Sequence, residues 1–310
     1  MKHSKLTVLL PFIFSCGTQV WACSSCGCSL SSDWGSLGVA TDEGLRFDLR
    51  YDFLNQNQMR FGTGKAHSTG EQELYTRNRY LTATLDYNWN ERWGVNVQLP
   101  YIQRSHATMG DPDAPAFSAS KTDSVGDVKV IGRYAGWGDG SVGIQFGLKL
   151  PTGSHTQKFN AGDAAGLPLD RGLQPGSGTT DVIFGAYRFD VLSENWDYFT
   201  QALLQLPVAA KDDFKPGNAL NVNVGFRYVG FEAFTPLLQI NARVSGKDVG
   251  AQATPNDSGG KTVYLSPGFM VPLNDRVKAY GFVQLPVYQN LNGFQLAPRY
   301  TVSVGSRIEF

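Results

Sequence analysis

Three cysteines near the N-terminus have the most obvious capacity for chemistry. Cys23, Cys26 and Cys28 lie in the segment Cys-Ser-Ser-Cys-Gly-Cys. Thiolates at this spacing could hold a soft metal ion such as Cu(I) or Zn(II), or Cys23 and Cys26 could form a disulfide in an oxidising compartment. Cys23 could also be lipidated. Glycine follows Cys26 where haem attachment needs histidine. These alternatives, and that of an inert tail, stay open.

The histidines do not suggest a catalytic centre. The chain has four, namely His3, His67, His106 and His155. We expect His3 in an N-terminal leader and the other three in three separate loops, where an isolated histidine is a solvated surface residue. A hydrolase built on strands would need serine and histidine side by side, and no histidine falls in a predicted strand. We therefore expect that the chain is not an enzyme.

The composition and the N-terminus indicate export. Lys+Arg and Asp+Glu number 27 each, so no net charge attracts nucleic acid. Only 17% of residues are charged, whereas glycine (35 copies) and aromatic residues (12%) are abundant. Lys2 and Lys5, an apolar run over 6–14 and Ala22 before Cys23 form the three regions of a signal peptide. We expect a signal peptide over 1–22, a cysteine-containing periplasmic segment over 23–43 and one folded domain over 44–310.

The folded domain has a period of two. Over 45–53, apolar and charged residues alternate, so one face of a strand would be apolar and the other ionic. Eleven further segments have strand character, and most are near the ~9–11 residues that a tilted strand needs to cross a bilayer. The eleven segments are 74–89, 93–102, 125–135, 142–151, 181–189, 196–207, 220–228, 234–245, 263–271, 277–288 and 298–310.

The connections between these segments alternate between short and long. Short turns are expected at 90–92, 136–140, 190–195, 229–232 and 272–276, and long connections at 55–73, 103–124, 152–180, 208–219, 246–262 and 289–297. Outer-membrane barrels have tight periplasmic turns and long outer loops. The sequence therefore predicts an all-β, up-and-down antiparallel barrel of twelve strands in the outer membrane, with both termini on the periplasmic side.

The last strand and the tryptophans support this prediction. Tyr300, Val302, Val304, Ile308 and Phe310 alternate along one face, and the chain ends at the aromatic residue. This resembles the terminal signal that the barrel-assembly machinery of the outer membrane recognises. The tryptophans beside the predicted short turns would mark the inner membrane–water boundary. These are Trp89, Trp93, Trp137 and Trp196.

Several short motifs resemble the meta-pathway phenol-degradation family of outer-membrane transporters and porin-like barrels. They are Arg92-Trp93-Gly94-Val95, Gln98-Leu99-Pro100-Tyr101, Gly126-Asp127-Val128, Lys149-Leu150-Pro151-Thr152-Gly153 and Gly178-Thr179-Thr180-Asp181. The resemblance covers about residues 75–310 and its motifs are architectural. It implies an outer-membrane channel, and passage of small hydrophobic or aromatic compounds is proposed for some members.

If the apolar face is outermost, charged side chains line the lumen. The predicted lining residues are Arg46, Asp48, Arg50, Asp52, Asp86, Asp127, Lys129, Arg133, Lys149, Arg188, Arg227, Arg243, Lys278, Arg307 and Glu309. Basic groups outnumber acidic ones, which favours anions, although many charges could pair across strands. The loop over 152–180 could fold inward and narrow the bore.

Two functions are compatible with these patterns. The first is a passive channel for small solutes, either anionic or hydrophobic and aromatic, with a mildly basic lumen. The second is a closed structural or docking barrel whose cysteine segment engages a periplasmic metal or redox partner. No other cofactor and no nucleic acid is expected.

Overall fold

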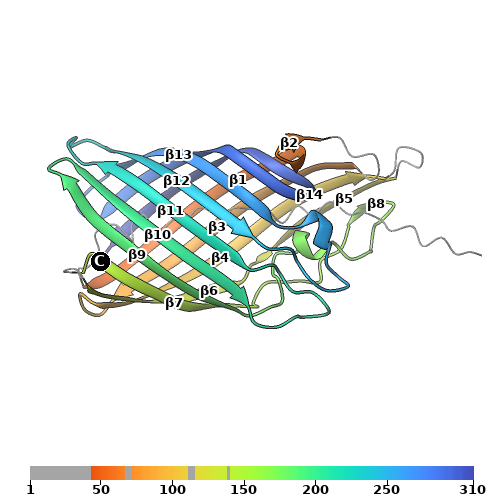
Figure 1. The fold of residues 1–310 in the computed structure, drawn as a ribbon, viewed down its shortest axis with the longest axis horizontal. Helices are drawn as coiled ribbons and strands as arrows, with labels where there is room; N and C mark the ends of the chain where they lie inside the picture. The colour runs from red at the N-terminus through yellow and green to blue at the C-terminus, as the bar shows by residue number, and fades with distance from the viewer. Residues whose placement is uncertain (1–42, 67–71, 111–115, 138–139) are drawn as a thin grey trace, which may run out of the picture.

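The chain forms a barrel of long, tilted antiparallel strands (Figure 1). The computed structural model describes residues 43–66, 72–110, 116–137 and 140–310. Its strands are β1 (Gly44–Gly62), β2 (Gly64–Lys65), β3 (Gln72–Asn88), β4 (Trp93–Met109), β5 (Phe117–Val125), β6 (Val128–Trp137), β7 (Val142–Leu150), β8 (Ala161–Gly162), β9 (Asp181–Ser193), β10 (Trp196–Pro207), β11 (Ala219–Tyr228), β12 (Thr235–Ser245), β13 (Gly260–Pro272) and β14 (Val277–Glu309). Two short 3-10 helices, η1 (Arg171–Leu173) and η2 (Pro255–Asp257), lie in loops. No helix in the described ranges is long and apolar enough to cross a bilayer.

The barrel closes because the first and last long strands pair. β1 pairs with β3 on one side and with β14 on the other. From β3 the antiparallel ring continues through β4, β6, β7, β9, β10, β11, β12 and β13 to β14. Eleven strands form this ring, while β2, β5 and β8 extend it at the end where the long loops lie. A closed sheet leaves no unpaired edge, which is what a sheet in lipid requires.

Two strands have a compound pairing. β5 and β6 both run antiparallel to β4, β5 along residues 101–109 and β6 along residues 93–98. β14 spans 33 residues. Residues 278–291 pair with β13 and residues 291–309 pair with β1, while Gly293 has a φ of +58°. The connection predicted over 289–297 is shorter than expected, because strand pairing continues to Leu291 on one side of Gly293 and resumes at Phe294 on the other.

The wall has its apolar side chains outside and its polar side chains inside. Leu85, Phe184 and Ile240 are more than 40% exposed, whereas their inward-pointing neighbours Asp86 and Gln239 are nearly inaccessible. A soluble protein has the opposite arrangement, because apolar surface in contact with water is unfavourable. An apolar outer wall matches a barrel whose surroundings are acyl chains.

One end of the barrel carries short turns and an aromatic rim. The Asn90 side chain accepts hydrogen bonds from the backbone N–H groups of Arg92 and Trp93, and Asn274 makes the same kind of turn before β14. Trp93 lies 4.7 Å from Tyr134 between ring centroids. All four tryptophans expected near these turns are exposed. The C-terminus lies at this end (Figure 1).

At the opposite end, several strands are longer than predicted. β1 reaches Gly62 where strand character was expected to end near residue 54, and β4 reaches Met109 instead of residue 102. In these extensions polar residues occupy both faces, as in the run 103–106. Alternation of apolar and polar residues is needed only where one face contacts lipid. The pattern therefore ends before the hydrogen-bonded ladder does.

Candidate functional site inside the barrel

The predicted lumen residues fall into three groups by burial. Eight are buried inside the barrel, namely Arg46, Asp48, Arg50, Asp52, Asp86, Arg133, Lys149 and Arg307. Six are partly buried, namely Asp127, Lys129, Arg227, Arg243, Lys278 and Glu309. The prediction for Arg188 is wrong, because its side chain is 54% exposed and Tyr187 occupies the inward position. In the run Tyr187-Arg188-Phe189, aromatic residues flank the arginine, so the pattern did not define which face was polar.

An aspartate between two arginines forms a buried cluster near the short-turn end. Arg133 donates to both carboxylate oxygens of Asp86, at 2.9 and 3.0 Å, and Arg46 lies 3.4 Å from the same carboxylate. Asn96 donates to it from β4 at 3.1 Å. The two guanidinium groups give the buried carboxylate charge-assisted hydrogen bonds, which offset the cost of removing its charge from water. The cluster therefore ties β1, β3, β4 and β6 together from inside.

A second polar cluster joins the strands at which the barrel closes. Tyr280 donates a 2.8 Å hydrogen bond to Asp48, and Arg307 lies 3.8 Å from that carboxylate. Arg50 pairs with Asp52 at 2.8 Å. Lys278 pairs with Glu309 within β14. Farther round the wall, Arg227 pairs with Asp197. Most of the predicted basic groups thus have an acidic neighbour, which reduces the field that they could exert along a bore.

An apolar cluster, which was not expected from the sequence, also faces inward. Ala135, Tyr187, Phe199, Leu237 and Phe282 are buried together, and Phe189, Met270 and Tyr280 pack against them. These residues come from β6, β9, β10, β12, β13 and β14, so the cluster extends along the wall from β6 to β14. The alternation along each strand could have identified them. Phe199 and Leu237 stand at the same alternate positions as the inward-facing polar residues of their strands. We call this group the aromatic cluster.

A row of uncharged polar side chains lies next to the aromatic cluster. Gln201 donates to Gln145 at 2.8 Å and Asn223 donates to Gln201 at 3.1 Å. Asn241 donates to both Asn223 and Gln239, at 2.8 and 2.7 Å, and Ser266 donates to Asn241. We call these six residues the amide row. All six are buried, so side chains fill the barrel at this level.

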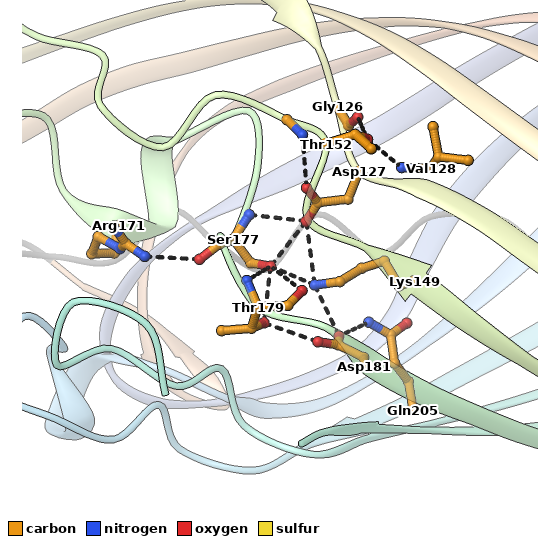
Figure 2. A network of polar contacts seen from close by, with 11 residues as sticks. Gly126, Asp127, Val128, Lys149, Thr152, Arg171, Ser177, Thr179, Asp181 and Gln205 are labelled. Atoms are coloured by element: carbon orange, nitrogen blue, oxygen red, sulfur yellow. Dashed lines mark hydrogen bonds and ion pairs between the residues drawn. The ribbon is translucent and has the colours of Figure 1, made fainter. Parts of the chain in front are cut away.

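The long loop over 152–180 enters the mouth of the barrel and is attached there by a polar network (Figure 2). The Asp127 carboxylate accepts hydrogen bonds from the backbone N–H groups of Gly153 and Ser177, at 3.0 and 2.9 Å. Lys149 places its ammonium between two carboxylates, 3.3 Å from Asp127 and 2.9 Å from Asp181. Thr179 donates to Asp181 at 2.9 Å. We call this network the loop latch.

The tip of the same loop carries its own small core. Phe159, Leu169 and Leu173 are buried against one another, and residues 173–176 are buried as well. Arg104 of β4 donates to the backbone carbonyls of Gly172 and Gln174, at 3.2 and 3.3 Å. The inward fold considered for this loop is therefore what the structure has.

His106 lies in β4 and not in a loop, so its predicted position is wrong. It is 1% exposed and contacts the ring of Phe159. Its Nδ1 atom is 2.9 Å from the Thr76 hydroxyl and its Nε2 atom is 3.3 Å from Glu73. The order hydroxyl–imidazole–carboxylate matches a nucleophile and its base, but Thr76 is fully buried, so no substrate reaches its oxygen in this arrangement.

His155 belongs to a charged group outside the wall strands. A two-residue turn with positive φ at Asp212 and Asp213 brings Asp212 within 3.3 Å of His155 and 3.8 Å of Arg171. A hydrogen bond from Lys211 holds the pKa of Asp212 below its ordinary value. This group connects the loop over 152–180 to the loop after β10.

Other predicted sites fall partly outside the described residues. Cys23, Cys26, Cys28, His3 and His67 all lie there. Within the described ranges, no group of three or more His, Cys, Asp or Glu residues could hold a metal ion. The five residues of the predicted assembly signal lie on the outer face of β14 and at the C-terminus, and Tyr300, Val304 and Phe310 among them are well exposed.

Known proteins are similar to this chain in structure rather than in sequence. No family model matches the chain, and no curated protein does. The structure of the COG4313 outer membrane channel from Pseudomonas putida F1 aligns with a TM-score of 0.64 at 14% identity, covering 86% of this chain and 96% of that chain. The chain shares the closed antiparallel β-barrel fold of that structure.

Two further solved structures align less well. The P. putida toluene transporter TodX gives a TM-score of 0.49 at 8% identity, covering 87% of this chain and 91% of that chain. The NanC porin gives 0.48 at 8% identity, covering 85% and 100%. At these identities the similarity concerns the fold alone. The resemblance to the phenol-degradation family stays a prediction.

Proposed function

We propose that this chain is an outer-membrane channel for the passive passage of small solutes, closed in the arrangement described. The observation that carries the proposal is the inverted wall, with apolar residues outside and hydrogen-bonded polar residues inside one closed sheet. That wall needs lipid outside. The fold similarity to an outer membrane channel supports the same conclusion.

We propose twelve membrane crossings, with both termini in the periplasm. β5 and β6 run in line along β4 and together count as one crossing. β14 counts as two, because its two parts pair with β13 and β1 and the chain turns near Gly293. With an even number of crossings, the chain enters and leaves the barrel on the same side. This is the short-turn side, which faces the periplasm in barrels of this kind.

The permeant that the interior suits best is small and neutral. Buried arginines and lysines have carboxylate neighbours, which weakens the case for an anion-selective bore. The aromatic cluster and the amide row offer apolar contact and hydrogen bonds without net charge. Of the two solute classes predicted from the sequence, hydrophobic or aromatic molecules therefore fit better than anions.

The loop latch keeps the loop over 152–180 in the mouth of the barrel, so the latch would have to break before a solute could pass. Residues 173–176 and the amide row are buried, so a solute must displace the loop and several side chains. The Asp127 carboxylate holds the loop by accepting from the backbone N–H groups of Gly153 and Ser177. Lys149 of β7 holds it by donating to the Ser177 hydroxyl. Opening the latch is the step that we expect to control passage.

Planar-bilayer conductance and liposome swelling test this proposal. Purified protein should give small, infrequent current steps, and a Lys149→Met variant with a released loop should conduct more often. A Lys278→Met variant serves as the matched control, because its ion pair with Glu309 lies away from the loop. Silence of the wild type and of the Lys149 variant, with both shown to be inserted, would refute channel function.

A closed docking barrel is the second candidate, and the filled interior favours it. In that function the segment over 23–43 would engage a periplasmic redox or metal partner through Cys23, Cys26 and Cys28 after removal of the signal peptide over 1–22. Replacing the three cysteines with serine should then abolish capture of the partner and of the metal. Unchanged metal content and partner capture would remove this candidate.

A further inference from the structure

Two buried glutamine side chains, one in the amide row and one beside it, each have an amide atom without a hydrogen-bond partner among the residues that the structure describes. Gln239 is fully buried, and its Oε1 atom accepts from Asn241 at 2.7 Å. In the described part of the chain, its Nε2 atom is one of the buried groups with no hydrogen-bond partner, and the Oε1 atom of Gln284 is another. Buried polar groups are nearly always paired, so an unpaired donor and an unpaired acceptor require an explanation.

The strand register brings these two glutamines to the same level of the wall. Gln239 of β12 pairs with Ser266 of β13. Ser266 lies between the pairs Leu265–Leu285 and Gly268–Phe282, which places it opposite Gln284 of β14. Adjacent strands are about 4.8 Å apart, so the backbones of the two glutamines are about 10 Å apart, with both side chains pointing inward. One small group between them could reach both amides.

The layer next to the two glutamines is apolar. Leu237 and Phe282 are the neighbouring inward residues on the same two strands, on the side of the short turns. Both belong to the aromatic cluster, together with Phe199. A molecule held by the glutamines would therefore place the rest of its surface against apolar side chains.

We propose that Gln239 and Gln284 form a subsite for the hydroxyl group of a small neutral molecule with an apolar body. A hydroxyl has one donor and two acceptor positions, so it can accept from the Gln239 Nε2–H and donate to the Gln284 Oε1. A carboxylate could not donate to Gln284, and an ammonium could not accept from Gln239. Because glutamine has three rotatable side-chain bonds, the two amides can turn to admit the hydroxyl. The subsite deepens the proposed channel function and rests on it for its role in passage, whereas its ligand can be tested without transport.

A matched pair of fluorinated probes tests the subsite. Binding of 4-fluorobenzyl alcohol and of 4-fluorotoluene to the full barrel in detergent micelles is measured by ¹⁹F NMR, with empty micelles as the reference for partitioning. We expect the alcohol to bind about tenfold more tightly than the hydrocarbon, because two net hydrogen bonds of ordinary strength are gained. Gln239→Leu and Gln284→Leu should each remove most of this preference while binding of the hydrocarbon changes little.

Gln56→Leu is the control, because it also removes a fully buried, hydrogen-bonded amide but lies on β1, outside the amide row and away from the subsite. The preference should persist in this variant. Equal binding of the two probes by the wild type, binding of neither, or full preference in both subsite variants would overturn the proposal. The wild-type comparison decides even where a variant does not fold. A barrel that binds the alcohol selectively but passes no solute into liposomes would refute the channel and leave the subsite standing.

Discussion

Removal of the Lys149 ammonium should destabilise the barrel far more than removal of an exposed one. Its Nζ atom lies 3.3 Å from Asp127 and 2.9 Å from Asp181, so the two carboxylate oxygens are at most about 6 Å apart. All three side chains are less than 10% exposed. At an effective dielectric constant of about 20, two bare carboxylates at that separation repel by about 3 kcal/mol. Removing one partner from a buried ion pair typically costs about 3–5 kcal/mol. We expect a loss in this range for Lys149→Met.

Equilibrium unfolding in urea, followed by tryptophan fluorescence of the reconstituted barrel, measures this loss. Lys278→Met is the control, because Lys278 pairs with Glu309 at 2.9 Å but both side chains are 36% exposed. Exposed pairs contribute about 0–1 kcal/mol. Adding Asp181→Asn to Lys149→Met should recover about 1–3 kcal/mol, because it removes the repulsion while the new amide can donate to the Thr179 hydroxyl and accept from Gln205. The reasoning fails if the two lysine variants lose the same stability, or if the double variant is no better than the single one.

Three further predictions concern the loop, the solution pH and assembly. Gly176→Ala should expose the loop over 152–180 to protease, because the new Cβ atom would clash with the backbone of Gly153; an unchanged cleavage rate would contradict the seating of the loop. Burial raises the pKa of Asp248 in the folded protein, so its contribution to stability is greatest below about pH 4 and is lost as the pH rises through the raised pKa; Asp248→Asn should remove this decline in unfolding measurements at pH 4 and 7. Phe310→Ala should lower the yield of heat-modifiable barrel in cells but not the unfolding free energy, because Phe310 is 70% exposed.

The barrel class could be predicted because lipid imposes a simple rule on each strand. Where a strand crosses the apolar layer, as in β1 over 45–53, alternation identifies the outer face and the inward charges together. The rule stops at the edge of that layer, and for this reason the extension of β4 was missed and His106 was expected in a loop. Arg188 was placed inside for a related reason, because its flanking aromatic residues left the polar face undefined.

The contents of the interior could be predicted by residue type but not by partner. Alternation identified Asp86 and Arg133 as inward-facing, yet 47 residues separate them, and only the barrel register brings the carboxylate and the guanidinium together. The aromatic cluster was missed because we expected an inward face to be polar. That expectation holds for a wide, water-filled bore. It fails in a narrow barrel, where side chains from facing walls meet and apolar residues can be buried on the inside too.

The filled interior affects how the proposed channel could distinguish one solute from another. In a wide pore, unpaired charges on the wall act at a distance on passing ions. Here most inward charges have an oppositely charged neighbour. In the proposed channel, a permeant would therefore exchange contacts with the aromatic cluster and the amide row. Discrimination would then follow hydrogen-bond geometry and apolar fit more than charge, because burying an ion without a partner costs far more than burying a hydroxyl that finds one. In the proposed channel, selection would depend on which of these interior contacts a permeant can replace.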